Sequence, residues 1–572
     1  MSKTRLAPAL AILLLALPVG LAHAADWPQF NLDSRHSGWS TQETTIHSGN
    51  VSTLHVLYHV TLPSIADGAP ALLTGVSTAS GVKDLLFLTT KAGHILALDA
   101  ATGTTIWSKQ PATTPNYTTS SPAVDPNRQF VYSYGLDGKV HKYQVGDGTE
   151  IMTGGWPQTT TLKPQVEKGS SALSLATAAD GTHYLYVANG GYPGDAGDYQ
   201  GHITAINLAT GAQKVFNANC SDQAVHFTTT TPDCSAVQTA IWARPGVVYD
   251  PDNDRIFMAT GNGNYNGNTG GHNWGDSVFA LHPDGSGASG LPVDAYTPTE
   301  FQTLQNNDAD LGSTAPAILP TPANSNVAHL GVQSGKDAML RLINLDDLSG
   351  MGGPGHLGGE LQKISVPQGG GVLTQPAVWV NPLDNQTWVF VANGSGISGL
   401  RLSIDGGGVP SLASQWMSGT GGTSPIVVNG MVFYATIGGS LRALEPTTGV
   451  QLWTDPSIAG IHWESPIVVN GVLYVTDESS MLWAFVPNAA PLSLNTLTPC
   501  RIVDTRQANG PLGGPALAGN GAKRVFALTG ACGVPADALA LAANVTVISP
   551  PAGGTLRVTP TGFASPSTTI SF

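Results

Sequence analysis

One acidic run in the sequence has the spacing of a metal-binding loop. In YDPDNDR (Tyr249–Arg255) the carboxylates of Asp250, Asp252 and Asp254 alternate along the chain, as oxygen ligands do in many Ca²⁺-binding loops. The same run lies between two apolar stretches and consists largely of residues that favour turns. We therefore interpret it as a hairpin turn, with a Ca²⁺ loop as the less favoured alternative.

Three other polar segments could carry chemistry. NNDADLG holds Asp308 and Asp310, either of which could act as a general base, although two solvated turn carboxylates would give the same pattern. SGKD places Lys336 directly after an apolar run, where it could meet an anion or lie on a surface hairpin. GNTGGHNWGD contains His272 and Trp274, which could line the mouth of a channel or belong to a solvated loop.

The elements that must position these residues recur along the chain. ILALDAATGTTIW (Ile95–Trp107) and LRALEPTTGVQLW (Leu441–Trp453) share an alternating apolar run, an acidic residue, Thr-Gly and a later Trp. The alternation is typical of a strand, Thr-Gly of a tight turn, and the Trp of the strand that follows. ITAINLATGAQKVF (Ile203–Phe216) is a third, weaker copy. The fold is therefore an array of repeated β units.

A second landmark gives the number of units. A Pro followed by small and β-branched residues opens seven of them: Pro70, Pro122, Pro245, Pro316, Pro376, Pro425 and Pro466. Ser170-Ser171-Ala172 has the same context without the Pro. Eight units, each long enough for about four short strands, predict an all-β fold built as an eight-bladed β-propeller. We expect the orphan strand Leu54–Leu62 to complete the eighth blade.

Composition agrees with a large β domain. Charged residues make up 11% of the chain, with 69 Gly and 40 Pro, as expected for short strands joined by turns. The formal net charge of −14 argues against a nucleic-acid partner, which would require a basic face.

The N-terminus predicts export. Lys3 and Arg5 precede the apolar run Leu6–Leu21 and the motif Ala22-His23-Ala24. This pattern is typical of a cleaved signal peptide over residues 1–24, with a membrane anchor as the alternative. No later segment is apolar enough to span a membrane. We expect a periplasmic or extracellular protein whose propeller occupies residues 25–486.

The chain changes character after the propeller. PNAAP begins a linker, residues 487–497, and residues 498–572 form a small β module. TPCRIVDTR and GACGVPADA in this module resemble a domain often appended to secreted bacterial proteins, and we treat it as an accessory. Its Asp504, Arg501 and Arg506 are interpreted as structural ion pairs.

Four cysteines in an exported protein suggest two disulfide bonds. Cys220 and Cys234 bracket a polar insertion, and Cys500 and Cys532 lie in the C-terminal module. The local pairing within each of these two pairs is the simplest of the possible arrangements. Metal binding is the alternative, but no second Cys or His pair lies at ligand spacing.

The repeats and the N-terminal DWPQFNLDSRHSG (Asp26–Gly38) resemble the quinoprotein dehydrogenase family. These are eight-bladed propellers with Ala-x-Asp-x-x-Thr-Gly-x-x-x-Trp repeats, and the resemblance covers most of residues 25–486. It implies pyrroloquinoline quinone and Ca²⁺ as cofactors. It also implies a small-molecule alcohol or sugar as substrate.

The resemblance assigns roles to four residues. IWARPGVVYDPDNDRIFMATGNGNYNG resembles the family's Trp…Tyr-Asp-Pro…Thr-Gly-Asn segment, which implies that Trp242 stacks on the quinone and Asn262 ligates Ca²⁺. By the same resemblance Asp310 is the catalytic base and a Ca²⁺ ligand, and Lys336 contacts the quinone. The structural alternatives are inter-blade packing for Trp242 and a turn for Asn262.

The sequence also departs from the family. GYPGDAGDYQGHITAIN lacks the Glu that the dehydrogenases supply to Ca²⁺, and neither Asp195 nor Asp198 stands at the matching offset. An adjacent Cys pair and a Cys-x-x-Cys-His haem motif are absent. We therefore keep three hypotheses: a quinone-dependent oxidoreductase, a propeller without cofactor that binds a glycan, peptide or protein, and an envelope assembly scaffold. The first is favoured narrowly.

Overall fold

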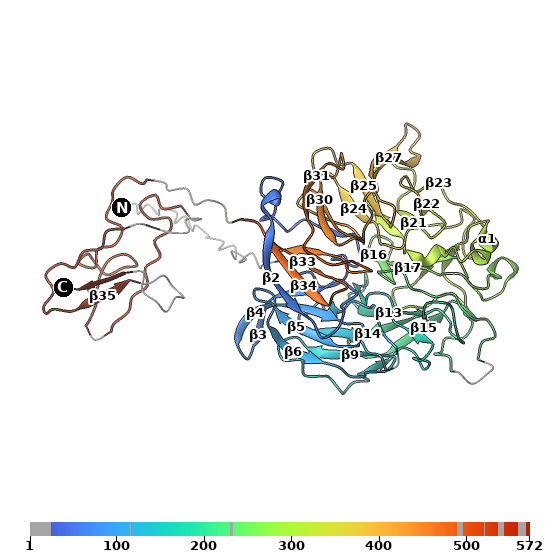
Figure 1. Cartoon of the computed structure of the whole chain (residues 1–572), viewed down its shortest axis with the longest axis horizontal. Helices are drawn as coiled ribbons and strands as arrows, with labels where there is room; N and C mark the ends of the chain where they lie inside the picture. Colours follow the sequence, from blue (N-terminus) through green and yellow to red (C-terminus); the bar gives the residue numbers. More distant parts are fainter. Residues whose placement is uncertain are drawn as a thin grey trace, which may run out of the picture. The chain divides into compact units, whose positions relative to one another are not determined.

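The computed structural model describes residues 25–114, 116–228, 233–488, 496–519, 521–535, 541, 543–558 and 568–571. The predicted signal peptide and residues 489–495 of the predicted linker lie outside this set. The chain divides into two compact units, residues 1–488 and 489–572. In the first unit, eight β-sheets surround a common axis (Figure 1). The predicted all-β, eight-bladed propeller is confirmed.

The four main strands of each blade form an antiparallel sheet. They follow one another in chain order in blades 1 to 7, and blade 8 takes its outer strand from the N-terminal side of the chain. Blades 1 to 4 consist of β3 (Ala71–Thr78), β4 (Gly81–Thr89), β5 (Ile95–Asp99) and β6 (Thr105–Lys109); β7 (Ala123–Val124), β8 (Phe130–Tyr134), β9 (Lys139–Gln144) and β10 (Gln158–Thr159); β12 (Ser174–Thr177), β13 (His183–Gly191), β14 (His202–Asn207) and β15 (Gln213–Asn217); and β16 (Val248–Asp250), β17 (Arg255–Ala259), β18 (Val278–Leu281) and β19 (Asp294–Tyr296).

Blades 5 to 8 repeat this arrangement. They consist of β20 (Ala317–Leu319), β21 (Leu330–Ser334), β22 (Met339–Asn344) and β23 (Gln362–Ser365); β24 (Ala377–Val380), β25 (Thr387–Ala392), β26 (Ile397–Ile404) and β27 (Pro410–Ser418); β28 (Ile426–Val428), β29 (Met431–Thr436), β30 (Ser440–Leu444) and β31 (Gln451–Asp455); and β32 (Ile467–Val469), β33 (Val472–Thr476), β34 (Met481–Val486) and β2 (His55–Thr61).

Short elements complete the first unit. They are β1 (Trp39–Ser40), β11 (Glu167–Lys168), the helix α1 (Phe301–Asn306) and the 3₁₀ turns η1 (Val51–Thr53), η2 (Gly267–Thr269) and η3 (Leu311–Ser313). Among the described residues, no helix has the length and apolar character needed to cross a membrane.

The repeated motif joins each blade to the next. Trp107 pairs with Ala97 on β5, and its indole N–H donates to the carbonyl of Val145 in blade 2 at 2.9 Å. Its ring lies where a Cβ on Gly148 would be, 2.6 Å from the nearest ring atom. Trp416 of blade 6 has the same relation to Gly449 of blade 7. The turn Gly, in Asp147-Gly148 as in Thr448-Gly449, therefore serves two purposes, because it takes a left-handed φ and leaves room for the neighbouring aromatic ring.

The ring closes as the sequence predicts. β2 pairs antiparallel with β34, so a strand from the N-terminal side of the chain becomes the outer strand of the last blade (Figure 1). Tyr58 on this strand lies 2.7 Å from the position of a Cβ on Gly103 in blade 1. The last blade thus meets the first through the same aromatic-to-glycine contact, and no blade edge is left open at the junction.

The N-terminal segment covers the inner edges of the blades. Carbonyls between Trp27 and Gly38 accept backbone N–H groups from the innermost strands of five blades at 2.7–2.9 Å; the donors are Leu72, Val124, Tyr249, Val378 and Val427. His36 is fully buried in this segment, and burial lowers its pKa. Its neutral ring donates from Nδ1 to the Phe30 carbonyl and accepts at Nε2 from Ser174.

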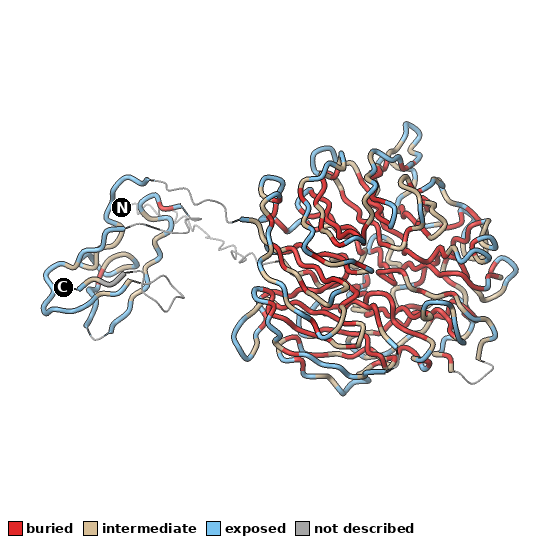
Figure 2. Tube along the Cα trace, viewed as in Figure 1, coloured by how far each residue is buried: buried red, intermediate tan, exposed pale blue. Residues whose placement is uncertain are grey.

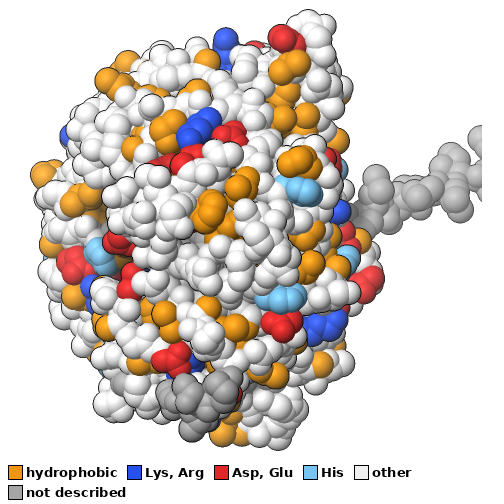
Figure 3. Space-filling view, turned by 90° about the vertical axis from the view of Figure 1, so that its right-hand side faces the viewer, with side chains coloured by type: hydrophobic (Ala, Val, Ile, Leu, Met, Phe, Trp, Pro, Cys, Tyr) orange, Lys and Arg blue, Asp and Glu red, His pale blue; other side chains and the backbone are white. Residues whose placement is uncertain are grey.

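The buried residues form clusters within and between the blades, as the tube in Figure 2 shows. The face in Figure 3 is mostly uncharged, with Lys and Arg scattered among Asp and Glu. Cys220 and Cys234 form a disulfide bond, as predicted. Tyr249–Arg255 forms the turn of the β16–β17 hairpin, which confirms the interpretation of the acidic run.

The second unit contains one described strand pair, β35 (Thr555–Val558) with β36 (Thr568–Ser571). The predicted Cys500–Cys532 disulfide is present. Asp504 forms ion pairs with Arg501 at 3.0 Å and Arg506 at 2.7 Å. This agrees with their interpretation as structural residues.

We expect Gly148→Ala to lower the melting temperature more than Gly430→Ala does. Both glycines have a φ of +68°, so a methyl group strains both backbones. Only the methyl at Gly148 would overlap a ring, since nothing lies within 4 Å of a Cβ at Gly430. Overpacking costs about 1–3 kcal/mol beyond the shared strain. Thermal unfolding followed by circular dichroism measures the difference, and equal losses would contradict the role given to the Trp–Gly contact.

Candidate functional site

Polar side chains gather at one end of the blades because of the strand order. In an antiparallel hairpin the start of the first strand and the end of the second lie side by side. Trp242 and Asp310 precede the first strands of blades 4 and 5, and Asn262 and Lys336 follow the second strands of the same blades. The topology therefore brings together four residues that are up to 94 positions apart in the sequence.

All four predicted site residues meet at one carboxylate. Asp310 Oδ2 accepts the indole N–H of Trp242 at 3.0 Å and pairs with Lys336 Nζ at 2.9 Å. Asp310 Oδ1 accepts the backbone N–H of Asn262 at 2.9 Å. The Lys336 ammonium also lies 5.3 Å from the centre of the Trp242 ring. We call Trp242, Asn262, Asp310 and Lys336 the Asp310 group.

Burial and charge set the protonation of this group. The Asp310 side chain is 6% exposed, and burial raises its pKa although the Lys336 ammonium opposes the shift. Burial disfavours the Lys336 ammonium, but Asp310 and Asp308 outweigh it and raise the pKa of Lys336. Asp308 is 66% exposed and reaches Lys336 at 3.1 Å. Asp310 is therefore the buried carboxylate of the pair, and Asp308 the solvated one.

Asp195 lies beside the group, a placement that sequence offset did not reveal. Its Oδ2 is 3.4 Å from Asn262 Nδ2, and its Oδ1 accepts the hydroxyl of Tyr199 at 2.5 Å. Asp198, the other carboxylate in this loop, faces the buried Lys163 at 3.9 Å. The loop after β13 is an insertion rich in Gly, so counting residues could not select Asp195.

Asp276 supports the segment that carries the central carboxylate. It is buried just before β18, and its Oδ1 accepts the backbone N–H of Leu311, the residue after Asp310. Burial, together with the charge of Asp310, raises the pKa of Asp276 to about 8. No sequence pattern singled out this residue.

Two buried cationic side chains lie before the first strands of blades 3 and 4. Arg244 is buried and donates to the carbonyls of Asp67, Thr119 and Ser170, thereby joining blades 1, 2 and 3 to blade 4. Lys168 is 5% exposed, and its ammonium lies 4.1 Å from the ring centre of Tyr117. Burial lowers the pKa of Lys168 to about 7. Neither residue was selected from the sequence.

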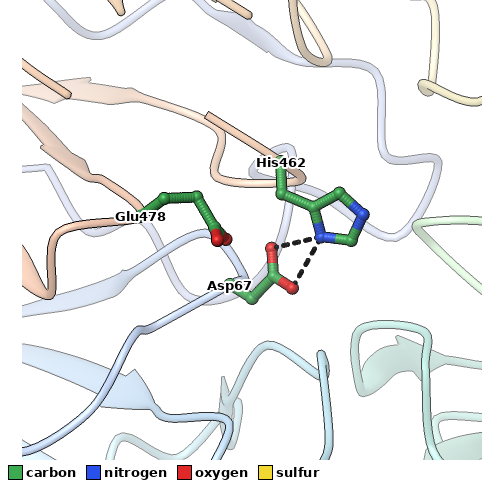
Figure 4. A group of neighbouring side chains, drawn as sticks. All are labelled: Asp67, His462 and Glu478. Carbon is green, nitrogen blue, oxygen red and sulfur yellow. Dashed lines mark hydrogen bonds and ion pairs between the residues drawn. The ribbon is translucent and has the colours of Figure 1, made fainter. Parts of the chain in front are cut away.

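A second group of charges lies at the meeting of blades 1 and 8. Asp67 contacts Lys91 at 3.1 Å and His462 at 2.9 Å, and Lys91 also contacts Glu478 at 2.9 Å. We call Asp67, Lys91, His462 and Glu478 the Asp67 group; three of them are drawn in Figure 4. Trp463 lies next in the chain, 6.4 Å from Trp242 in an edge-on arrangement.

The contacts of His272 and Trp274 hold a loop in place. The His272 carbonyl accepts the backbone N–H of Ser221, and His272 Nδ1 lies 3.4 Å from the Gly290 carbonyl. Trp274 is buried, donates to Ser221 and packs against Tyr265. Both residues fix the loop that follows β17, beside the disulfide-bonded insertion.

Two family models match parts of this chain. Residues 27–288 match the model of the glucose/ethanol/alcohol dehydrogenase β-propeller domain, and residues 381–532 match that of the outer membrane protein assembly factor BamB. Both matches are to PQQ-type models, and each covers less than half of the chain.

Individual relatives are distant. The chain is 23% identical over 352 residues to the dehydrogenase subunit of a quinone alcohol dehydrogenase from Komagataeibacter europaeus, covering 56% of this chain and 44% of that protein. The chain thus spans less than half the length of the curated relatives it matches.

Two solved structures show the same fold. A quinohemoprotein alcohol dehydrogenase of Pseudomonas putida HK5 aligns with a TM-score of 0.55 at 15% identity, covering 86% of this chain and 83% of that chain. One from Comamonas testosteroni has the same TM-score at 16% identity, covering 84% and 83%.

We expect Lys168→Met to stabilise the protein at pH 6 and to have little effect near pH 10. With a pKa near 7, native Lys168 holds a buried charge below that pH. Between pH 7 and about 10.4 the unfolded chain retains a proton that the native state has lost, so the wild type gains stability as pH rises. Melting temperatures at the two pH values test this, with the exposed Lys109→Met as control. A difference independent of pH would refute the shifted pKa.

Proposed function

We propose that the propeller binds pyrroloquinoline quinone and Ca²⁺ at the Asp310 group and oxidises an alcohol or sugar. The observation that carries the proposal is the convergence of Trp242, Asn262 and Lys336 on the buried carboxylate of Asp310. This combination supplies an aromatic face, an amide, a cation and a base within one group. Packing between blades alone would not require a buried carboxylate there.

The donor set suits Ca²⁺. Asp310 accepts the backbone N–H of Asn262 at 2.9 Å, and the side-chain amide nitrogen of Asn262 lies 3.4 Å from Asp195. These residues offer two carboxylates and one amide, and Ca²⁺ prefers such oxygen ligands. In this proposal Asp195 replaces the Glu that the sequence lacks. Tyr199, whose hydroxyl is bonded to Asp195, orients that ligand.

The quinone would find complementary groups around the same axis. Trp242 is half-buried and offers a ring for stacking. The quinone is a tricarboxylate, and Lys336, Lys168 and Arg244 supply positive charge around the axis. Lys168 has no carboxylate within ion-pair distance among the described residues, so an anion could serve as its counter-charge.

The protein's own contribution to the reaction is a placed base. Held by these residues, the quinone would supply a two-electron acceptor for the alcohol, and Ca²⁺ would supply a Lewis acid. Asp310 takes the hydroxyl proton, and burial makes its carboxylate a stronger base than one in water. Lys336 keeps that carboxylate ionised before the proton arrives. The electrons then pass to a separate acceptor.

We further infer export to the periplasm or the outside of the cell. The signal-like N-terminal sequence and the two disulfide bonds support this location. A propeller without cofactor that binds a glycan, peptide or protein is the alternative function. The match of residues 381–532 to an assembly-factor model favours a scaffold among such alternatives.

Titration with pyrroloquinoline quinone and Ca²⁺ tests the proposal. Protein beginning at Ala25 should bind the quinone saturably and only with Ca²⁺, as followed by absorbance and tryptophan fluorescence. Asn262→Ala should weaken this binding by about tenfold or more, since it removes a proposed ligand. The exposed Asp384→Asn is the matched control. No binding at high micromolar quinone would leave the alternative function.

Measurements of turnover distinguish the roles of the two carboxylates near Lys336, those of Asp310 and Asp308. Asp310→Asn keeps a side-chain oxygen at the proposed Ca²⁺ site, so the quinone should still bind. Dye-linked oxidation of alcohols or sugars should fall about 10²–10⁴-fold, because the base is gone. Asp308→Asn should lose far less, since that carboxylate is exposed to solvent. If Asp308→Asn were the more damaging change, the base would be assigned to Asp308.

A further inference from the structure

The Asp67 group repeats the Asp310 group four blades away. Asp67 precedes the first strand of blade 1 and Lys91 follows its second strand, as Asp310 and Lys336 do in blade 5. Glu478 follows the second strand of blade 8, where blade 4 has Asn262. In both places a Lys ammonium bridges a buried Asp to a second carboxylate.

The indoles extend this correspondence. Trp463 stands three residues before Pro466, and Trp242 stands three before Pro245. Trp463 donates its backbone N–H to Asp67 at 3.1 Å, whereas Trp242 donates its indole N–H to Asp310. In both groups these contacts hold a buried aspartate: the side chain of Asp67 is 0% exposed and that of Asp310 is 6% exposed. The propeller thus presents two related places where a cation meets carboxylates.

The Asp67 group adds an imidazole. One ligand atom each from Asp67, His462 and Glu478 lies within 4.8 Å of the others, a compact set whose side chains point toward one another in Figure 4. His462 Nδ1 is 2.9 Å and 3.2 Å from the two oxygens of Asp67. One nitrogen and two carboxylate oxygens form a donor set typical of Zn²⁺ and similar divalent metals.

A second observation points to a ligand here. Glu464 is fully buried two residues after His462, and its Oε1 has no hydrogen-bond partner among the described atoms. Its Oε2 accepts the backbone N–H of His462 at 2.6 Å, so the carboxylate lies beside the group. A buried, unpartnered oxygen is costly unless something donates to it. Water bound to a metal at this place would be such a donor.

The Lys91 ammonium occupies the place between the two carboxylates where a metal ion would bind. Its ammonium touches both Asp67 and Glu478, and its side chain is 23% exposed, so it can leave toward solvent without crossing the core. An ammonium and a divalent metal compete for the same two carboxylates. His462 is half-exposed, which leaves its ring accessible from the channel.

We propose that Asp67, His462 and Glu478 form a binding site for a divalent metal of the Zn²⁺ class, which displaces the Lys91 ammonium. This site is separate from the proposed Ca²⁺ site and does not depend on it. Its ligands come from blade 1 and blade 8, so the metal joins the two blades at which the ring closes. Binding therefore stabilises the closed propeller.

Zinc titration of the EDTA-treated protein, from Ala25 and without an affinity tag, tests the site. With Ca²⁺ present throughout, calorimetry should give one Zn²⁺ per chain, and Zn²⁺ should raise the melting temperature. Glu478→Gln and His462→Ala should each weaken binding by about tenfold or more. Lys91→Met should tighten binding by a similar factor, because the competing ammonium is gone.

The controls separate this result from surface binding and from misfolding. His329→Ala removes a His whose side chain is 26% exposed and pairs with a single carboxylate, Asp346, and should change nothing. Asp195→Asn should likewise leave Zn²⁺ binding unchanged, whatever it does to Ca²⁺. Should His462→Ala unfold in EDTA, His462→Gln replaces it. The site is disproved if wild-type protein binds no Zn²⁺ saturably, or if Lys91→Met fails to tighten binding.

Discussion

The innermost strands of a propeller have an edge that no strand of their own blade can pair, and the structure depends on how these edges are satisfied. Backbone N–H groups that face the axis would cost free energy if they were buried without partners. Here a single segment, Trp27–Gly38, supplies carbonyls to five blades. His36 is anchored in it as a neutral ring. The axis is thereby filled at that level, and polar side chains gather where the inner strands begin.

Charged residues are few in this chain, and several of them are buried in the segments that lead into the innermost strands. Only 11% of residues are charged, yet the segments that enter the inner strands hold Asp67, Arg244 and Asp310, all buried. Arg244 satisfies carbonyls of three neighbouring blades rather than a carboxylate. The two buried aspartates each receive a Lys from the end of the second strand of their own blade. The hairpin formed by the first two strands of a blade therefore brings an Asp and a Lys together as an ion pair.

The sequence was sufficient for the fold because the fold repeats. Thr-Gly and Trp recur with the same spacing, and the structure explains each by a contact between blades, that of Trp107 with Gly148 and that of Gly449, from the second Thr-Gly, with Trp416. The role of Leu54–Leu62 as the outer strand of the last blade followed from counting strands, and β2 confirms it. The repeated motif and the expected closure of the ring therefore predicted the same fold, as local and global features do in well-specified folds.

The sequence predicted only part of the candidate site. Trp242, Asn262, Asp310 and Lys336 were found because they resemble family positions, and the structure brings them into contact. Asp195 was left undecided because its loop has no fixed register against that family. The Asp67 group is a harder case, since its Asp and Glu are 411 residues apart. No motif spans that separation, and only ring closure places those two side chains together.

The two aspartate groups differ in the one respect that governs which ion each can hold. Together with Asp195, the Asp310 group offers only oxygen donors as candidate metal ligands, from two carboxylates and an amide, and oxygen donors favour hard cations such as Ca²⁺. The Asp67 group replaces the amide of Asn262 with the carboxylate of Glu478 and adds the imidazole of His462. Nitrogen donors shift preference toward the zinc class. Under the two proposals, a duplicated frame, in which a blade hairpin pairs an aspartate with a lysine, would serve two different cations. The lysine in each pair neutralises the buried aspartate when no metal is bound, so neither place leaves an uncompensated charge in the core.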